Sequence, residues 1–181
     1  RNVIGGRGVA LKTHGPMDVE ARRLKGRPIL RGAIGSEPSA ANHAAFGRPT
    51  DFYSRRPTTR MGVEWEWRKA FYDAMSYRDQ KTVPDPKDRP PVNPGMEVLV
   101  KVLEGNLMVH PTARAEQEIR TALRIAKEFG YKTVIQGGVE TWRVIDEVAE
   151  AQAKVIFSPP SLNGAGNMDG AEGRYHTLNM M

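Results

Sequence analysis

Three short apolar runs decide the fold: Leu107-Met108-Val109-His110, Thr133-Val134-Ile135-Gln136 and Val155-Ile156-Phe157. Apolar residues at helical spacing fill both gaps between these runs, at about 115–129 and 140–151, and Gly130 is a typical helix end. The order strand, helix, strand, helix, strand predicts parallel strands joined by crossover helices. We therefore predict an α/β fold in which strands at 107–110, 132–136 and 154–158 are adjacent and parallel.

A longer helix is predicted upstream, at about 62–80. Apolar residues recur there on one helical face: Val63, Trp67, Ala70, Phe71, Ala74 and Tyr77. Trp65 and Tyr72 lie off this stripe, so we expect the helix to bury a second flank. The prolines that follow predict an 81–95 segment without regular structure, and a short helix is expected at Met96–Leu103.

The first 60 residues have a different character, because they are rich in Gly, Pro and Arg and show no helical periodicity. Short extended pieces are expected at 9–12 and 28–31, with loops elsewhere. Few periodic apolar positions are available to build a core. We therefore expect residues 1–60 to pack against the rest of the chain or against another protein chain.

The net charge of +6 is concentrated in this first segment. Residues 1–60 hold 12 Lys and Arg against 4 Asp and Glu, whereas residues 61–181 hold 15 against 17. The basic segment lacks interleaved aromatic residues and a continuous basic helix, so no nucleic-acid partner is predicted. A basic surface facing an acidic neighbour, or solubility alone, is favoured. No apolar run approaches the ~18 residues of a membrane span.

The sequence leaves the compartment open. It has no cysteine, which excludes disulfides, thiolate metal sites and cysteine nucleophiles, and both a cytoplasmic and a periplasmic location stay possible. The first residue is Arg1 and no apolar signal core follows it, so the chain reads as one entered partway. Three parallel strands alone would leave two bare edges. We therefore expect the segment to be part of something larger.

His110 is the first candidate for chemistry, because it ends the first apolar run. In parallel α/β folds, catalytic and metal-binding side chains converge at the carboxyl ends of the strands. An imidazole there can bind a divalent metal or transfer a proton near neutral pH. The alternative is a hydrogen-bonded histidine at the rim of the sheet.

A second candidate region follows the next run, at Gln136-Gly137-Gly138-Val139-Glu140. Two glycines permit the close approach of a ligand to the backbone. Gln136 and Glu140 are therefore candidates for substrate contacts, although Glu140 could also simply complement the dipole of the following helix.

Other chemical motifs are weak or missing. Gly5-Gly6-Arg7-Gly8 lacks the glycine order of a phosphate-binding loop. The sequence contains no His-x-His, no His-Glu-x-x-His and no serine nucleophile elbow. A complete three-ligand zinc site from this chain alone is therefore not expected.

Four motifs occur in order: Val3-Ile4-Gly5-Gly6, Ile34-Gly35-Ser36-Glu37-Pro38, Thr58-Thr59-Arg60-Met61-Gly62 and Met108-Val109-His110-Pro111-Thr112-Ala113-Arg114. Together with the stretch from 119 to 159, they resemble the middle of metal-dependent amidohydrolases of the imidazolonepropionase-like group. The similarity spans nearly the whole chain.

The resemblance implies part of a TIM (β/α)8 barrel. A closed barrel needs about 250 residues, so this chain would form one incomplete domain: a loop-rich basic segment at 1–60 and a partial barrel segment at 61–181. The family places metal-binding histidines at the ends of the fifth and sixth strands. His110 matches the fifth-strand histidine, whereas Gly137 falls where the sixth-strand histidine would be.

The resemblance further implies that the intact protein hydrolyses a non-peptide C–N bond of a small-molecule substrate with zinc or another divalent metal. This chain alone is expected to be inactive, with few or no metal ligands of its own. The alternative is a catalytically silent, amidohydrolase-like subunit with a structural or assembly role, which Gly137 favours. In both cases the expected partner is the remainder of the barrel or another protein chain, in an oligomer or complex.

Overall fold

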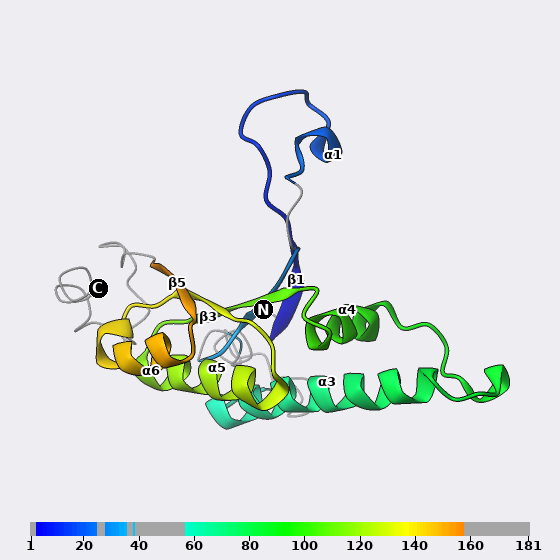
Figure 1. Cartoon of the computed structure of the whole chain (residues 1–181). Helices are drawn as coiled ribbons and strands as arrows, with labels where there is room; N and C mark the ends of the chain where they lie inside the picture. The colour runs from blue at the N-terminus through cyan, green and yellow to red at the C-terminus, as the bar shows by residue number, and fades with distance from the viewer. Residues whose placement is uncertain (1–2, 25–27, 36–37, 39–56, 158–181) are drawn as a thin grey trace, which may run out of the picture.

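A five-stranded sheet organises the chain, and its strands lie in the order in which they occur in the sequence (Figure 1). The computed structural model describes residues 3–24, 28–35, 38 and 57–157. The strands in this part are β1 (Ile4–Gly8), β2 (Ile29–Ala33), β3 (Met108–Ala113), β4 (Val134–Gly137) and β5 (Lys154–Phe157). The helices are α1 (Val19–Arg22), α3 (Arg60–Lys81), α4 (Pro94–Leu103), α5 (Glu116–Phe129) and α6 (Ile145–Glu150), with short 3-10 turns η2 (Pro86–Asp88) and η3 (Thr141–Arg143).

Strand pairing confirms the predicted α/β fold. β2, β3, β4 and β5 are parallel to one another in sequence order, and β1 adds an antiparallel strand beside β2. The crossover helices α5 and α6 lie within the predicted ranges, and Gly130 ends α5 in the left-handed region, at φ 69°. Within the described residues β1 and β5 are the outer strands, so the barrel that the resemblance implies is not seen as a closed structure.

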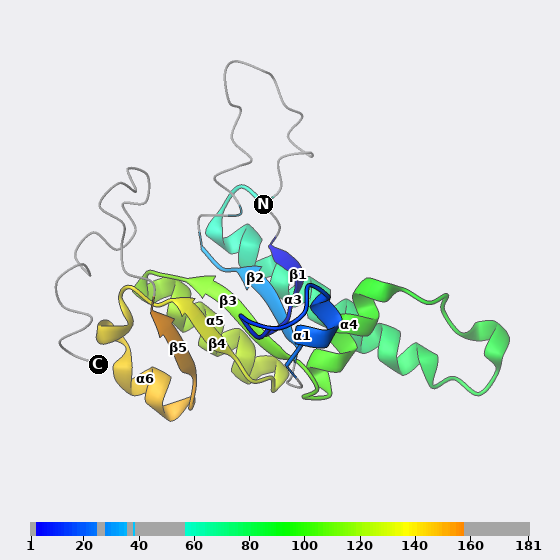
Figure 2. The ribbon, with the colours of Figure 1, turned by 90° about the horizontal axis from the view of Figure 1, so that it is seen from above.

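The two faces of the sheet differ. Helices α3, α5 and α6 lie on the same side of it (Figures 1 and 2). Along β3, the residues that face these helices are buried and the residues between them are half-buried, as period-2 alternation requires. We call the side packed against the helices the covered face and the opposite side the open face. Met108, His110 and Thr112 of β3 lie on the open face.

The core lies between the covered face and α3. The predicted stripe is confirmed, because Val63, Trp67, Phe71, Ala74 and Tyr77 are all buried. The ring of Phe71 is at its centre and stacks on Trp67, Phe129 and Tyr131, with ring centroids 6.1, 5.0 and 5.0 Å away.

The position of the Trp67 indole explains why β2 has a glycine at position 32. Its Nε1 donates a hydrogen bond to the carbonyl oxygen of Ala33 at 3.1 Å. A Cβ at Gly32 would lie 2.4 Å from Cζ2 of the indole, so only glycine lets the helix approach this closely.

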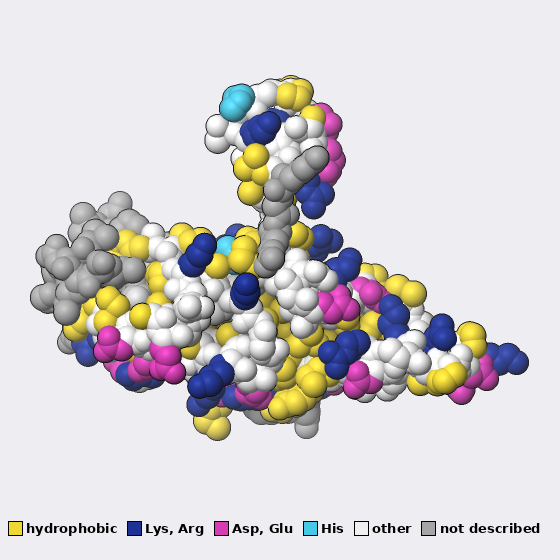
Figure 3. All heavy atoms as spheres, viewed as in Figure 1, with side chains coloured by type: hydrophobic (Ala, Val, Ile, Leu, Met, Phe, Trp, Pro, Cys, Tyr) yellow, Lys and Arg dark blue, Asp and Glu magenta, His cyan; other side chains and the backbone are white. Residues whose placement is uncertain are grey.

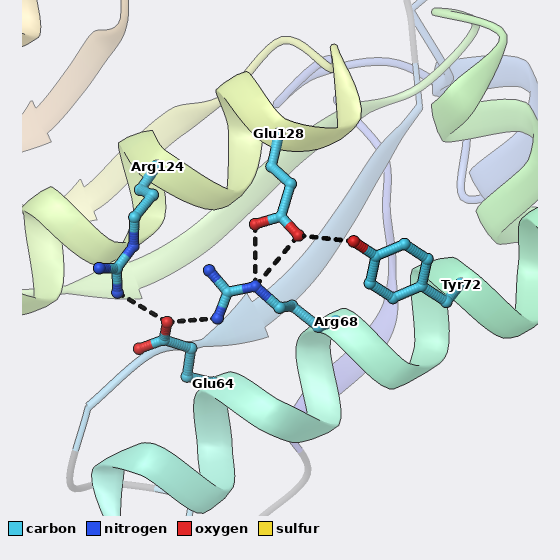
Figure 4. Close-up of polar contacts among 5 residues, drawn as sticks. All are labelled: Glu64, Arg68, Tyr72, Arg124 and Glu128. Carbon is cyan, nitrogen blue, oxygen red and sulfur yellow. Dashed lines mark hydrogen bonds and ion pairs between the residues drawn. The ribbon is translucent and has the colours of Figure 1, made fainter.

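The predicted second buried flank of α3 is wrong, because Trp65 and Tyr72 are 55% and 53% exposed. A polar network on this side joins α3 to α5 instead (Figure 4). Glu64 accepts hydrogen bonds from Arg68 and, at 2.6 Å, from Arg124. Glu128 accepts from Nε of Arg68 at 2.8 Å and from the Tyr72 hydroxyl at 3.0 Å. The Tyr72 hydroxyl is thus satisfied at the surface.

The first segment contributes more regular structure than predicted. The glycine-rich stretch is β1, whereas the extended piece expected at 28–31 is the start of β2. Residues 9–12 form no strand: only Leu11 makes an isolated bridge, with Arg23, in an arm of residues 9–24 that stands apart from the sheet (Figures 1 and 3). Leu30 and Ile34 belong to the main core cluster, so β2 and the residue after it pack with the rest of the chain, whereas the arm does not (Figure 1). The division at residue 60 stays a prediction.

The proline-rich linker is also more ordered than predicted. Pro86–Asp88 forms a 3-10 turn, and α4 begins at Pro94, a position where proline is favourable because the first helical N–H has no partner anyway. Within the described residues, no helix is long and apolar enough to cross a membrane.

Candidate functional site

The candidate site lies on the open face, over the middle of β2 and β3 and the adjacent part of β4. His110 does not end its strand as predicted, because Pro111, Thr112 and Ala113 continue β3. Proline is uncommon within a central strand, which is why the sequence indicated an earlier end. His110 thus projects from the middle of β3, on the side that the helices leave free.

The surroundings of the His110 imidazole favour its neutral form. Its Nε2 atom is buried and has no hydrogen-bond partner among the described residues. Burial lowers the pKa of His110, and the positive charge of Arg31 lowers this pKa further. A neutral imidazole nitrogen without a partner can accept a hydrogen bond or bind a metal ion.

Arg31 joins this site, although no motif or pattern in the sequence singled it out. It lies opposite His110 in the pairing of β2 with β3. Its Nη2 donates a hydrogen bond to Oε1 of Gln136 at 3.2 Å, and Gln136 belongs to β4. Arg31 thus lies opposite His110 and binds Gln136, whereas Gln136 itself is opposite Thr112 in the pairing of β3 with β4.

Glu140 lies away from this site, where it helps to join the loop that follows β3 to the loop that follows β4. Its Oε2 accepts a hydrogen bond from the backbone N–H of Glu116, the first residue of α5, at 2.8 Å. Its own N–H donates to the carbonyl of Arg114 at 2.9 Å, and the N–H of Gly138 donates to the carbonyl of Ala113 at 2.9 Å. The sequence left open a role for Glu140 at the start of the following helix, but its carboxylate binds the first N–H of the preceding helix, α5, and makes no capping bond to η3. A substrate contact by Glu140 stays a prediction.

Two glycines are required by this link. Gly137 and Gly138 have φ angles of +106° and +51°. A Cβ at Gly138 would lie 2.5 Å from Cγ1 of Val155, and one at Gly137 would lie 3.1 Å from Cγ of Arg114. A histidine could not replace Gly137 without a change of the backbone.

The described residues fit a metal ion only in part. Among them, no group of three or more His, Cys, Asp or Glu side chains is placed to hold one. A zinc site takes three or four protein ligands. The buried, unpartnered nitrogen of His110 suits one such ligand, so the described part of the chain supplies at most one imidazole to a shared site.

Other candidates lie away from this site. His14 is exposed in the arm, whereas His43, His176, Ser158 and Ser161 are outside the described residues. A pocket of about 940 Å³ lies at the opposite end of the strands, between α5, α6 and the starts of β4 and β5. Leu123, Lys127 and Lys154 line it, but His110 and Gln136 do not.

Comparison with known proteins gives one informative similarity. No family model and no curated protein sequence matches the chain. The structure is similar to that of an amidohydrolase from Thermotoga maritima MSB8, with a TM-score of 0.78 and 26% sequence identity. The match covers 94% of this chain and 43% of the Thermotoga chain, so this chain spans less than half the length of its neighbour. The fold is therefore amidohydrolase-like, and the comparison does not single out the imidazolonepropionase-like group.

Proposed function

We propose that the intact protein is an amidohydrolase that hydrolyses a non-peptide C–N bond of a small molecule. The similarity to the Thermotoga amidohydrolase over 94% of this chain carries the proposal. The imidazole of His110 on the open face supports it, because its buried Nε2 has no hydrogen-bond partner among the described residues.

In this proposal His110 is one ligand of zinc or another divalent metal, and the other ligands come from outside the described residues. A divalent ion bound there would lower the pKa of a bound water and polarise the carbonyl of the substrate. Burial and the charge of Arg31 lower the pKa of His110, which favours the neutral ring that a metal ion requires. Gln136 contacts the substrate from the neighbouring strand. The chain alone is inactive, because it supplies too few ligands.

Metal analysis of the full-length protein tests this role of His110. We expect bound metal in the wild type, and a loss of most of it in His110→Ala. The matched control is His14→Ala, because that histidine is exposed in the arm and should leave metal content unchanged. Undiminished metal in His110→Ala would contradict the assignment. Hydrolysis of small amides by the same preparations tests the activity separately.

One observation favours a second candidate function, a catalytically silent subunit with a structural or assembly role. The backbone at Gly137 has a φ of +106°, at the position where the resemblance places a metal-binding histidine. In that case the wild-type protein would hold no metal and would be isolated in a stable oligomer or complex with the remainder of a barrel. Metal content and mass from light scattering on one sample distinguish the two functions.

A further inference from the structure

The guanidinium of Arg31 lies over β3 on the open face. Arg31 belongs to β2 and its hydrogen-bond partner Gln136 belongs to β4, while β3 lies between them. Adjacent strands are about 4.8 Å apart, so the side chain must extend across β3 to make a 3.2 Å bond to the Gln136 amide. Because Arg31 is opposite His110 in the strand register, this path brings its charge close to the imidazole.

Among the described residues Arg31 has no carboxylate partner, as is also true of Arg89, which binds two backbone carbonyls. Two arginines of the helices differ in this respect. Arg68 binds Glu64 and Glu128, and Arg120 binds Glu116 and Glu147. Within the described residues Arg31 has only the neutral amide of Gln136. A guanidinium has five N–H donors in a fixed planar fork, which suits a carboxylate. The Gln136 bond uses one donor and fixes the plane of the others.

We propose that Arg31 binds a carboxylate group of the substrate and thereby places the scissile bond next to His110, with Gln136 as the residue that positions the guanidinium. The proposal rests on the proposed function for the identity of the reacting centre. It adds the substrate class: small molecules that carry a carboxylate beside the C–N bond. The competing explanation is that a carboxylate of the intact protein, from outside the described residues, already neutralises Arg31.

A matched pair of probes separates these explanations. N-acetylglycine and N-acetylglycinamide contain the same acetamide bond, and only the first carries a carboxylate. Their affinities for the full-length protein are measured by NMR titration at constant ionic strength. We expect the acid to bind at least about tenfold more tightly than the amide, as a charge-assisted bidentate contact provides. Equal affinities in the wild type would overturn the proposal.

Substitutions then assign the selectivity to Arg31. Arg31→Met should bring the acid-to-amide ratio to about one, and Arg31→Lys should keep part of it. Arg78→Met removes the same charge from α3, away from the sheet, and should leave the ratio unchanged. If Arg31→Met keeps the wild-type ratio, Arg31 is not the carboxylate site.

Gln136→Glu is the sharpest variant, because it places an internal carboxylate on Arg31. We expect it to fold normally and to lose the preference for the acid, whereas Gln136→Met should weaken that preference less. If the Arg31–Gln136 bond has only a structural role, Gln136→Glu should instead leave the acid-to-amide ratio unchanged, since an ion pair would only strengthen the bond. Retention of acid selectivity by Gln136→Glu would overturn the proposal.

These titrations measure binding and need no turnover. Acid selectivity that depends on Arg31, in a protein without metal or hydrolytic activity, would overturn the proposed function and keep the carboxylate site. Bound metal and hydrolytic activity without acid selectivity would support the proposed function and overturn the carboxylate site.

Discussion

The covered and open faces of the sheet each hold a buried polar atom without a partner among the described residues, and they differ in what surrounds it. On the covered side, the Tyr131 hydroxyl belongs to a ring stacked on Phe71, and burial strongly raises the pKa of Tyr131. On the open side, Nε2 of His110 lies close to Arg31, and the pKa of His110 is lowered. Both shifts favour the neutral side chain.

The neighbouring side chains lead to different interpretations of these two unpartnered atoms. Aromatic neighbours offer the Tyr131 hydroxyl nothing to share with a ligand, so its burial is a cost of packing. A cation and an amide near His110 could hold the polar groups of a substrate around the imidazole. An unpartnered polar atom therefore indicates a binding site where its surroundings are polar, and a packing compromise where they are apolar.

The largest expected effect is a loss of stability, and it should differ between a variant of the covered face and a variant of the open face. Phe71→Ala leaves a cavity among three aromatic rings and should lower the free energy of unfolding by about 3–5 kcal/mol. Met108→Ala, on the half-buried open face, should cost clearly less. Urea denaturation of the full-length variants gives both values. Similar losses for the two variants would mean that the open face is packed as tightly as the covered one.

A smaller effect is expected at the link between the loops that follow β3 and β4. Gly137→Ala places a Cβ on a backbone with φ +106°, so we expect a loss of about 1–3 kcal/mol. Gly6→Ala is the control, because nothing lies within 4 Å of a Cβ there and its φ is not positive. A Gly137→Ala protein as stable as the control would show that this loop can adapt, and a histidine there would become feasible.

The smallest effect tests the Tyr131 hydroxyl. Tyr131→Phe removes a buried group without a partner and should leave stability unchanged or raise it by about 1 kcal/mol. Because the pKa of Tyr131 is raised in the folded protein, only the unfolded chain loses this proton just above pH 10. Wild-type stability should therefore fall as the pH rises above 10, and Tyr131→Phe should fall less. A destabilised Tyr131→Phe would show that the hydroxyl has a partner.

Local pattern was enough to predict the α/β unit and the buried stripe of α3, because apolar periodicity reports which side of an element is covered. It failed where polar contacts decide the outcome. Tyr72 is exposed because its hydroxyl binds Glu128, 56 residues away. Likewise β3 continues through Pro111, although a proline normally argues against a central strand.

The site was predictable only in part, for the same reason. His110 and Gln136 could be singled out because each lies in or just after an apolar run. Arg31 could not, because its contact with Gln136 joins residues 105 apart and depends on the pairing of three strands. Glu140 had two possible roles from sequence, a substrate contact or a place at the start of the following helix, and neither points to its bond with the N–H of Glu116 in the preceding helix, 24 residues away.

The order of the strands bears on how the chain folds during its synthesis. Among these five strands the ribosome releases β1 first and β5 last, so each of the later four emerges when its sheet neighbour already exists. The longest wait is between β2 and β3, because α3 and α4 are made in between. At about 5–20 residues per second, that interval lasts several seconds. During this time Trp67 of α3 can already reach the Ala33 carbonyl, so among these elements we expect α3 to dock on the β1–β2 pair before β3 joins the sheet.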